Sequence, residues 1–233
     1  MKKIGLIIFG IALVLGVVLA NVFSFGRLST HIFNCSANLS GTKGSGNVTR
    51  ESRDVTGFNS VDVSSVFQVE ITAQKDFAVE IEADDNLLPL IKTAVAGGVL
   101  KISAEQKVSP SSPIRVHIYA PDIETLEVSG AANVVLNDID NQALSVDSSG
   151  ASKIKITGET AKLTVDVSGA SKVEAEDLNT EDADVDASGA SHINVNVTGS
   201  LRADASGASR IVYSGKPKNL EKKTSGASSV SQK

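Results

Sequence analysis

The chain has 233 residues, is 41% hydrophobic but only 4% aromatic, and carries a formal net charge of −5 at pH 7. A core without large rings must be built from Val, Ile, Leu and Ala, which favours thin, regularly layered β structure. The acidic balance argues against nucleic acid as a partner, because phosphate binding needs clustered Lys and Arg. The single cysteine, Cys35, excludes an intrachain disulfide and cannot make a cysteine-rich zinc site by itself.

Residues 1–26 carry an apolar run behind a basic start. Met1-Lys2-Lys3 precedes Ile4–Ala20, which contains no charged or strongly polar side chain. Cleavage after Ala20 would make this segment a signal peptide, whereas about 20 apolar residues can also span a bilayer as an uncleaved anchor helix. Both alternatives stay open. Both place the rest of the chain outside the cytoplasm, in the cell envelope, either periplasmic or exposed at the surface.

Residues 27–46 are rich in Ser, Gly, Thr and Asn without a sustained period, which is typical of a flexible tether. The folded domain is therefore predicted to occupy residues 47–233. Cys35 lies in the tether, and the Ile32-Phe33-Asn34 that precedes it lacks the small residue expected before a lipidated cysteine. We therefore interpret Cys35 as a bystander thiol.

The first part of the domain alternates apolar and polar residues, the two-residue period of half-buried strands. The alternating stretches are Val61–Ile71, Phe77–Ala83, Val99–Ser103 and Ile114–Tyr119. Between them Leu87–Lys92 is the one plausible helical turn, and Asp85 or Asn86 is placed to cap it.

The second part is organised by a recurring Ser-Gly-Ala phrase, which predicts regular repeats over about residues 122–231. Its glycines are Gly130, Gly150, Gly169, Gly189, Gly207 and Gly226, separated by 20, 19, 20, 18 and 19 residues. So even an interval indicates one structural unit stacked on copies of itself. The stretch around Ser65 resembles a degenerate first copy, with Ser65 in the place of the glycine.

Residues at even offsets from each glycine are apolar and are predicted to face inward, while odd offsets face solvent. This pattern predicts two short strands per turn that meet at a glycine corner, hence an all-β, parallel β-solenoid with turns of about 19 residues. Two residues after the glycine, serines also fall in the inward phase: Ser152, Ser171, Ser191, Ser209 and Ser228. Their hydroxyls should bond to corner backbone groups or to the serine of the neighbouring turn.

Two outward positions form charged columns that are candidate binding surfaces. Three residues before the glycine the column is acidic, with Glu127, Asp147, Asp166, Asp186 and Asp204, followed by Lys223. Three residues after the glycine it is largely basic, with Asn133, Lys153, Lys172, His192 and Arg210. The acidic column could share divalent cations, and the basic one could meet an acidic glycan or lipid headgroup. The alternative for both is a solvated face that prevents sideways aggregation.

No motif for a catalytic nucleophile, a phosphate loop or a metalloprotease occurs in the sequence. We therefore predict no catalytic residue, cofactor site or metal site. His31, His117 and His192 are too far apart in sequence to show metal-ligand spacing. Acidic residues are plentiful, but they recur in register rather than standing out as one catalytic pair.

The six Ser-Gly-Ala-(Ser/Ala)-x-(Val/Ile) phrases, Arg53–Phe58 and Asp84–Pro89 together resemble the bacterial family of putative auto-transporter adhesins with a head GIN domain. The resemblance covers about residues 46–230. It implies a β-solenoid domain on the cell envelope, usually behind an export signal. It implies no particular catalytic or binding residue.

The resulting functional hypothesis is a non-enzymatic, exported envelope domain, adhesin-like, that binds an envelope protein or a glycan along its flat faces. A second hypothesis is a structural or stress-sensing envelope protein that self-associates or binds a membrane partner, with the N-terminal segment holding it to the membrane if uncleaved. Lysines near the last turn could instead guard that end by their charge: Lys216, Lys218, Lys222 and Lys223. A polysaccharide-active enzyme is the third hypothesis.

Overall fold

The computed structural model describes residues 41–233, which form one all-β unit. Within this range the single helical element is a 3-10 turn, η1 (Leu88–Leu90). The strands, in chain order, are β1 (Thr42–Lys43), β2 (Val48–Arg53), β3 (Ser60–Ser65), β4 (Gln68–Thr72), β5 (Ala78–Asp84), β6 (Ile91–Ala96), β7 (Val99–Ala104), β8 (Val108–Ser109), β9 (Arg115–Tyr119), β10 (Thr125–Gly130), β11 (Asn133–Gly150), β12 (Lys153–Gly169), β13 (Lys172–Ala187), β14 (His192–Val197), β15 (Ser200–Ala205), β16 (Arg210–Ser214), β17 (Asn219–Thr224) and β18 (Ser229–Gln232).

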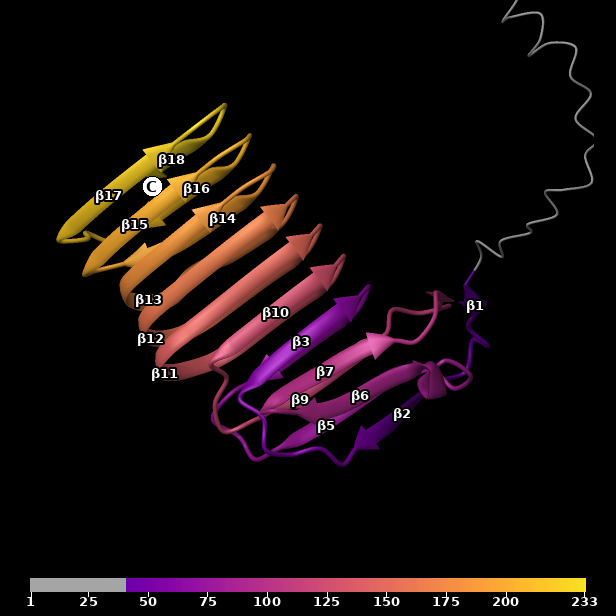
Figure 1. Ribbon diagram of the computed structural model, residues 1–233. Helices are drawn as coiled ribbons and strands as arrows, with labels where there is room; N and C mark the ends of the chain where they lie inside the picture. The colour runs from indigo at the N-terminus through magenta and orange to yellow at the C-terminus, as the bar shows by residue number, and fades with distance from the viewer. Residues whose placement is uncertain (1–40) are drawn as a thin grey trace, which may run out of the picture. The chain divides into compact units, whose positions relative to one another are not determined.

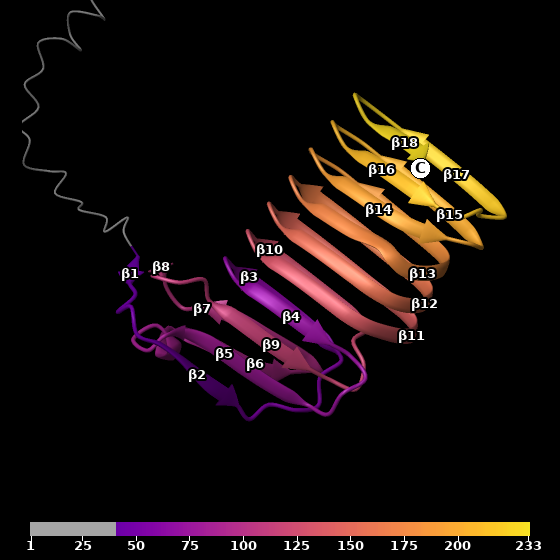
Figure 2. The same cartoon turned by 180° about the vertical axis from the view of Figure 1, so that it is seen from behind.

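The strands wind into a flattened parallel β-solenoid, as predicted, with successive coils stacked in two layers (Figures 1 and 2). We call sheet A the layer of strands that lead into the glycine corners, and sheet B the layer of strands that leave them. Strands β11, β12 and β13 are long because each runs through sheet B, bends, and continues in sheet A. In β11 the bend falls where the register shifts between Leu136 and Ile139, beside Asp138 with its positive φ of 59°.

The core lies between the two sheets and consists of aliphatic columns. Leu144 and Val146 from sheet A and Ile154 and Ile156 from sheet B are each no more than 1% exposed. Each stacks on its equivalent one coil away, for example Val146 on Val165. The predicted alternation of inward and outward residues is therefore confirmed through the regular coils.

The glycine corners stack directly on one another. The six corner glycines have φ between 73° and 116°, a region that residues with a Cβ rarely adopt. Space is also lacking, since a Cβ on Gly169 would lie 2.4 Å from the carbonyl oxygen of Gly150. The following alanine donates its backbone N–H to the glycine one coil back, as from Ala170 to Gly150 at 2.7 Å. The ladder of backbone bonds thus continues through the corner.

The inward serines satisfy their hydroxyls in both predicted ways. Ser152 and Ser171 share a buried cluster with Ser148, whose Oγ lies 2.6 Å from the Oγ of Ser152 and 3.1 Å from that of Ser171. Farther along the solenoid the bonds go to corner backbone instead. Ser209 Oγ donates to the carbonyl oxygen of Ser206 at 2.6 Å, within its own corner.

Strands β3 and β4 form the degenerate first copy, and its predicted alignment is confirmed. Ser65 pairs with Gly130 and Val69 pairs with Val134, although an insertion of the chain separates the two coils in sequence. The insertion folds on the other side of this coil, where β7 pairs with β3 and β9 pairs with β4. After the insertion, the chain returns to the opposite side of β3 and β4 and begins β10 there. Strand β3 therefore lies between β7 and β10 in the sheet, although β7 comes between β3 and β10 in sequence.

Antiparallel strands cover the N-terminal end of the solenoid: β6 pairs with β7, β5 with β9, and β2 with β5. The buried Asp84 ties this cover together, because its carboxylate accepts hydrogen bonds from the backbone of Gly46 and from the backbone and hydroxyl of Ser111. These bonds hold the pKa of Asp84 below its usual value, with the Ser111 hydroxyl as the largest cause.

The helical turn lies where it was predicted, but its predicted cap is wrong. The N-cap position is Leu87, which makes no side-chain capping bond. Asp85 and Asn86 instead turn toward the incoming chain, where Ser45 donates its hydroxyl to Asp85 and its backbone N–H to Asn86. The predicted leader, Cys35 and His31 lie outside the described residues. Across residues 41–233, no helix has the length and apolar character needed to cross a membrane.

Candidate binding surface

Sheet A carries the acidic column on its solvent face, one carboxylate per strand. Backbone register brings the column's members side by side in the order Lys101, Asp62, Glu127, Asp147, Asp166, Asp186, Asp204 and Lys223. The alignment of Ser65 with the glycines could have added Asp62 to the predicted column. Lys101 had no such signal, because it comes from the insertion. The structure thus places a lysine at each end of the row.

In the part of the chain that the structure describes, only the outer members of the column have ionic partners. Lys101 lies 3.6 Å from Asp62 and Lys223 lies 3.2 Å from Asp204. Arg202 reaches Asp186 at 3.5 Å, and it pairs more closely with Asp184. The three central carboxylates belong to Glu127, Asp147 and Asp166. None of them makes an ion pair within residues 41–233. We call these three residues the central acidic trio.

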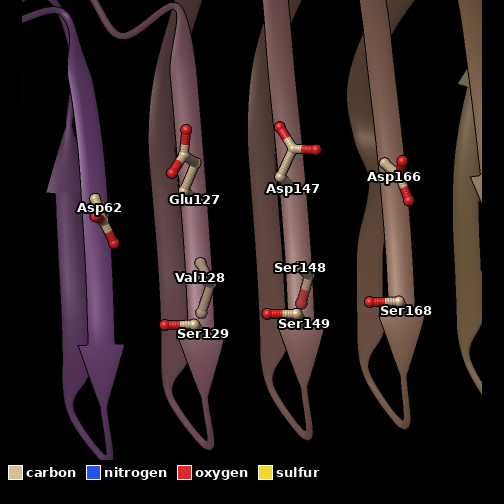
Figure 3. Close-up of a pocket in the computed structure, with 9 residues that line it drawn as sticks. All are labelled: Asp62, Glu127, Val128, Ser129, Asp147, Ser148, Ser149, Asp166 and Ser168. Carbon is tan, nitrogen blue, oxygen red and sulfur yellow. The ribbon is translucent and has the colours of Figure 1, made fainter.

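The central acidic trio lines a shallow open groove of about 610 Å³ on the face of sheet A. Ser129, Ser149 and Ser168 form a second row beside it, one hydroxyl per strand (Figure 3). Partial burial raises the pKa of Asp147, and the neighbouring charge of Asp166 raises it further. The groove is therefore a strip of negative charges, and a bound cation would reduce the repulsion between them.

The trio is spread along a line rather than gathered around a point. Each member comes from a different strand, and neighbouring strands in a sheet are about 4.8 Å apart. Within the described range, no three His, Cys, Asp or Glu side chains are grouped closely enough to hold a metal ion. The sharing of divalent cations along the column stays a prediction.

The basic column lies on the solvent face of sheet B. Register brings its members together in the order Arg115, Gln68, Asn133, Lys153, Lys172, His192 and Arg210. The structure adds Arg115 and Gln68 to the predicted residues. His117 belongs to the neighbouring outward column, beside Glu70 at 3.3 Å, so it does not join His192.

Nearby carboxylates balance part of the positive charge of this column, and Arg210 makes no ion pair within residues 41–233. Lys153 and Lys172 both pair with Glu174, at 3.1 Å and 2.5 Å. The hydrogen bond from Lys172 is the largest cause that holds the pKa of Glu174 below its usual value. Arg115 pairs with Glu82 in the same way. Glu174 was missed from sequence because the equivalent position holds no acid in the other regular repeats.

The geometry suits recognition by repeated contacts rather than reaction at one point. Carboxylates that come together on sheet A are equivalents of one another, each displaced by one coil. A glycosidase pair needs one carboxyl held protonated and the other held ionised by different surroundings. Along the column the surroundings repeat, and Ser, Asp and Glu recur in rows.

A family model described as "Putative auto-transporter adhesin, head GIN domain" matches residues 57–217. A comparison with curated proteins gave no match.

Several solved structures are similar in fold. One is a putative adhesin from Bacteroides fragilis, with 21% identity, a TM-score of 0.68, and coverage of 82% of this chain and 99% of that chain. A second is a putative lipid binding protein from Parabacteroides distasonis, with 17% identity, a TM-score of 0.51 and the same coverage, 82% and 99%. A third is a putative adhesin from the same organism, with 20% identity, a TM-score of 0.50, and again 82% and 99%.

Proposed function

The chain belongs to the family of putative auto-transporter adhesins with a head GIN domain, and from this premise we propose that it is a non-enzymatic, exported module of the cell envelope. It binds another surface along the flat face of sheet A. The observation that supports this most is the central acidic trio, because these three carboxylates lie in a row in an open groove and have no ionic partner among residues 41–233.

The charge pattern selects between the two faces. On sheet B the lysines of the basic column already have Glu174 as a partner, so an acidic ligand would have to compete with it. On sheet A the trio has no such partner in the described part of the chain and can accept protonated amines. We therefore propose an envelope protein or glycan with cationic groups as the partner, held by several weak contacts along the row.

The domain limits expected from the sequence are part of the same proposal. Residues 1–26 deliver the chain to the envelope, as a signal peptide or an anchor, and residues from about 47 onward form the binding domain. Contacts of the folded part begin upstream of that limit, where Thr42 and Lys43 pair with Val108 and Ser109.

Binding can be tested with the full chain and two matched variants on cell-wall fractions and glycan arrays. Variant E127Q/D147N/D166N removes the charge of the trio with little change of shape. Variant K153Q/K172Q removes two charges from sheet B. We expect binding of the first variant to weaken by about tenfold or more and that of the second to match the wild type.

Two results would overturn the proposal: no binding of the wild type to any fraction or glycan, or equal binding by the trio variant and the wild type. Calorimetric titration with calcium tests the cation hypothesis separately. Heat of binding and a raised melting temperature would support it, and the absence of both would exclude it.

A further inference from the structure

The coil formed by β17 and β18 is the last one in the described residues, and it leaves two strand edges open. Among the described strands, β17 pairs only with β15, and β18 only with β16. Open strand edges are templates for pairing with another chain. The side chain of Leu220 in β17 is 44% exposed, so this end also presents apolar surface.

Lys222 interrupts an inward column at this coil. Register places it after Val146, Val165, Val185 and Ala203, all of which belong to the core. Its ammonium lies 4.7 Å from the centroid of the Tyr213 ring, which closes the core on the opposite sheet. Its aliphatic stem can cover the ring while the ammonium stays at the open end, a favourable cation–π arrangement.

A second copy could meet this end through a two-fold axis normal to both sheets. Each strand would then pair antiparallel with its own equivalent and keep its outward face outward. With the register centred on residue 222, Glu221 lies opposite the Lys223 of the second copy, and Lys223 lies opposite Glu221. The axis then passes near Val230, which lies as far after the Gly226 corner as Lys222 lies before it, so Val230 meets its own equivalent.

We propose that the C-terminal coil is a self-complementary edge that Lys222 alone keeps from pairing with a second copy of this chain. Every other opposition in this register is favourable or neutral: two Glu221–Lys223 pairs outside, Leu220 against Thr224 and Val230 against itself inside. Lys222 would meet Lys222, two ammonium groups removed from water at the centre of the interface. One charge on each chain thus opposes pairing at this edge, while the faces stay free for binding.

The proposal concerns the end of the rod and does not rest on the proposed role of sheet A. It also separates self-association from surface binding as functions of this protein. A chain that does not pair at this end offers the faces of one solenoid to a partner. Lys222 is the residue that determines whether this end pairs.

Sedimentation velocity on the full chain in a mild detergent tests the proposal. We expect the wild type not to pair through this end and Lys222→Val to form a dimer, with an association constant at least about a hundredfold higher. A carbodiimide joins carboxylates directly to amines. In mixed 14N and 15N samples of the variant it should therefore link Glu221 of one copy to Lys223 of another. Residues 1–26 are common to all samples, so association through them would not differ between variants.

Charge variants supply the matched controls. K222V/E221K places like charges opposite each other and should lose the dimer, and K222V/E221K/K223E reverses both pairs and should regain it. Circular dichroism melts show that each variant is folded. A folded Lys222→Val that sediments like the wild type without the cross-link, or a wild type that already gives the cross-link, would overturn the proposal.

Discussion

The N-terminal cover and the regular coils solve the same problem of burying a sheet by different means. In the coils one corner recurs, so each backbone bond, each core residue and each surface charge recurs with it. In the cover, contacts occur once, as at Asp84, where residues from three distant segments meet. Repetition therefore produces columns of equivalent residues and extended faces, whereas the cover is held by one local hydrogen-bonded cluster around Asp84.

The two ends of the rod differ in the same way. Antiparallel strands of the insertion cover the N-terminal end. The C-terminal coil has no strand over its edges within residues 41–233, and only side-chain contacts lie there, with Lys222 over Tyr213 and Gln232 Nε2 donating to the carbonyl oxygen of Gly215 at 3.0 Å. We therefore expect one substitution at Lys222 to change pairing at the C-terminal end, whereas the edges at the N-terminal end are already covered by strands.

The corner glycines should show the largest effect. Gly169→Ala forces a Cβ into a region with φ of 99° and against the Gly150 carbonyl oxygen. We expect a loss of about 3–5 kcal/mol in the free energy of unfolding, measured by urea denaturation. Gly57→Ala is the control, because its φ of 75° is also positive but nothing lies within 4 Å of the added Cβ. It should cost only about 1–2 kcal/mol, and equal losses would contradict a role for close stacking.

A core substitution in the middle of the rod should rank next. Leu163 is fully buried between coils, and Leu163→Ala should cost about 3 kcal/mol through lost burial and a cavity. Leu220 holds the equivalent position in the last coil but is 44% exposed. Leu220→Ala should therefore cost about 0.5 kcal/mol. Similar losses at the two positions would show that the last coil is packed as tightly as the middle.

The cover should be sensitive to acid through Asp84. Its pKa is lowered in the folded state, so its stabilising bonds are present above the ordinary carboxylate pKa near 4 and are lost as pH falls through the lowered value. Thermal melts between pH 2 and pH 7 should show a loss of melting temperature at the acid end. Asp84→Asn should reduce that loss and lower the melting temperature at pH 7, by less than Leu163→Ala does. An unchanged acid profile in the variant would contradict this assignment.

The coils were predictable from sequence because every copy restates the same rule. Offsets from the glycine located the core, the inward serines and both charged columns, and the alignment of Ser65 located the first copy. The cover was not predictable in this way, since a period carries no information about where an insertion folds. Nothing in sequence placed Lys101 beside Asp62, or showed that Asp84 rather than a helix cap would organise this end.

Contacts that occur only once within the repeats could not be predicted from sequence for the same reason. Glu174 pairs with two lysines, but its equivalents in neighbouring coils are Lys155 and Asn194, so the repeat pattern gave no sign of an acidic residue at this position. The choice between the two faces depends on this one residue. Periodicity therefore predicted which surfaces exist, and the structure adds which of their charged side chains are paired.

The smallest expected effect is at the acidic column, and its sign is informative. The pKa of Asp147 is raised, so its ionised form slightly destabilises the fold, and this cost grows as pH rises through the raised pKa. Asp147→Asn should therefore raise the free energy of unfolding at pH 7, by a few tenths of a kcal/mol after solvent screening. Asp204→Asn should lower it by a similar amount, because Asp204 has Lys223 as a partner at 3.2 Å. Opposite signs in urea denaturation would show that the middle of the column is kept charged at the expense of stability, as a binding face requires. Equal signs would mean that the column is an ordinary solvated surface.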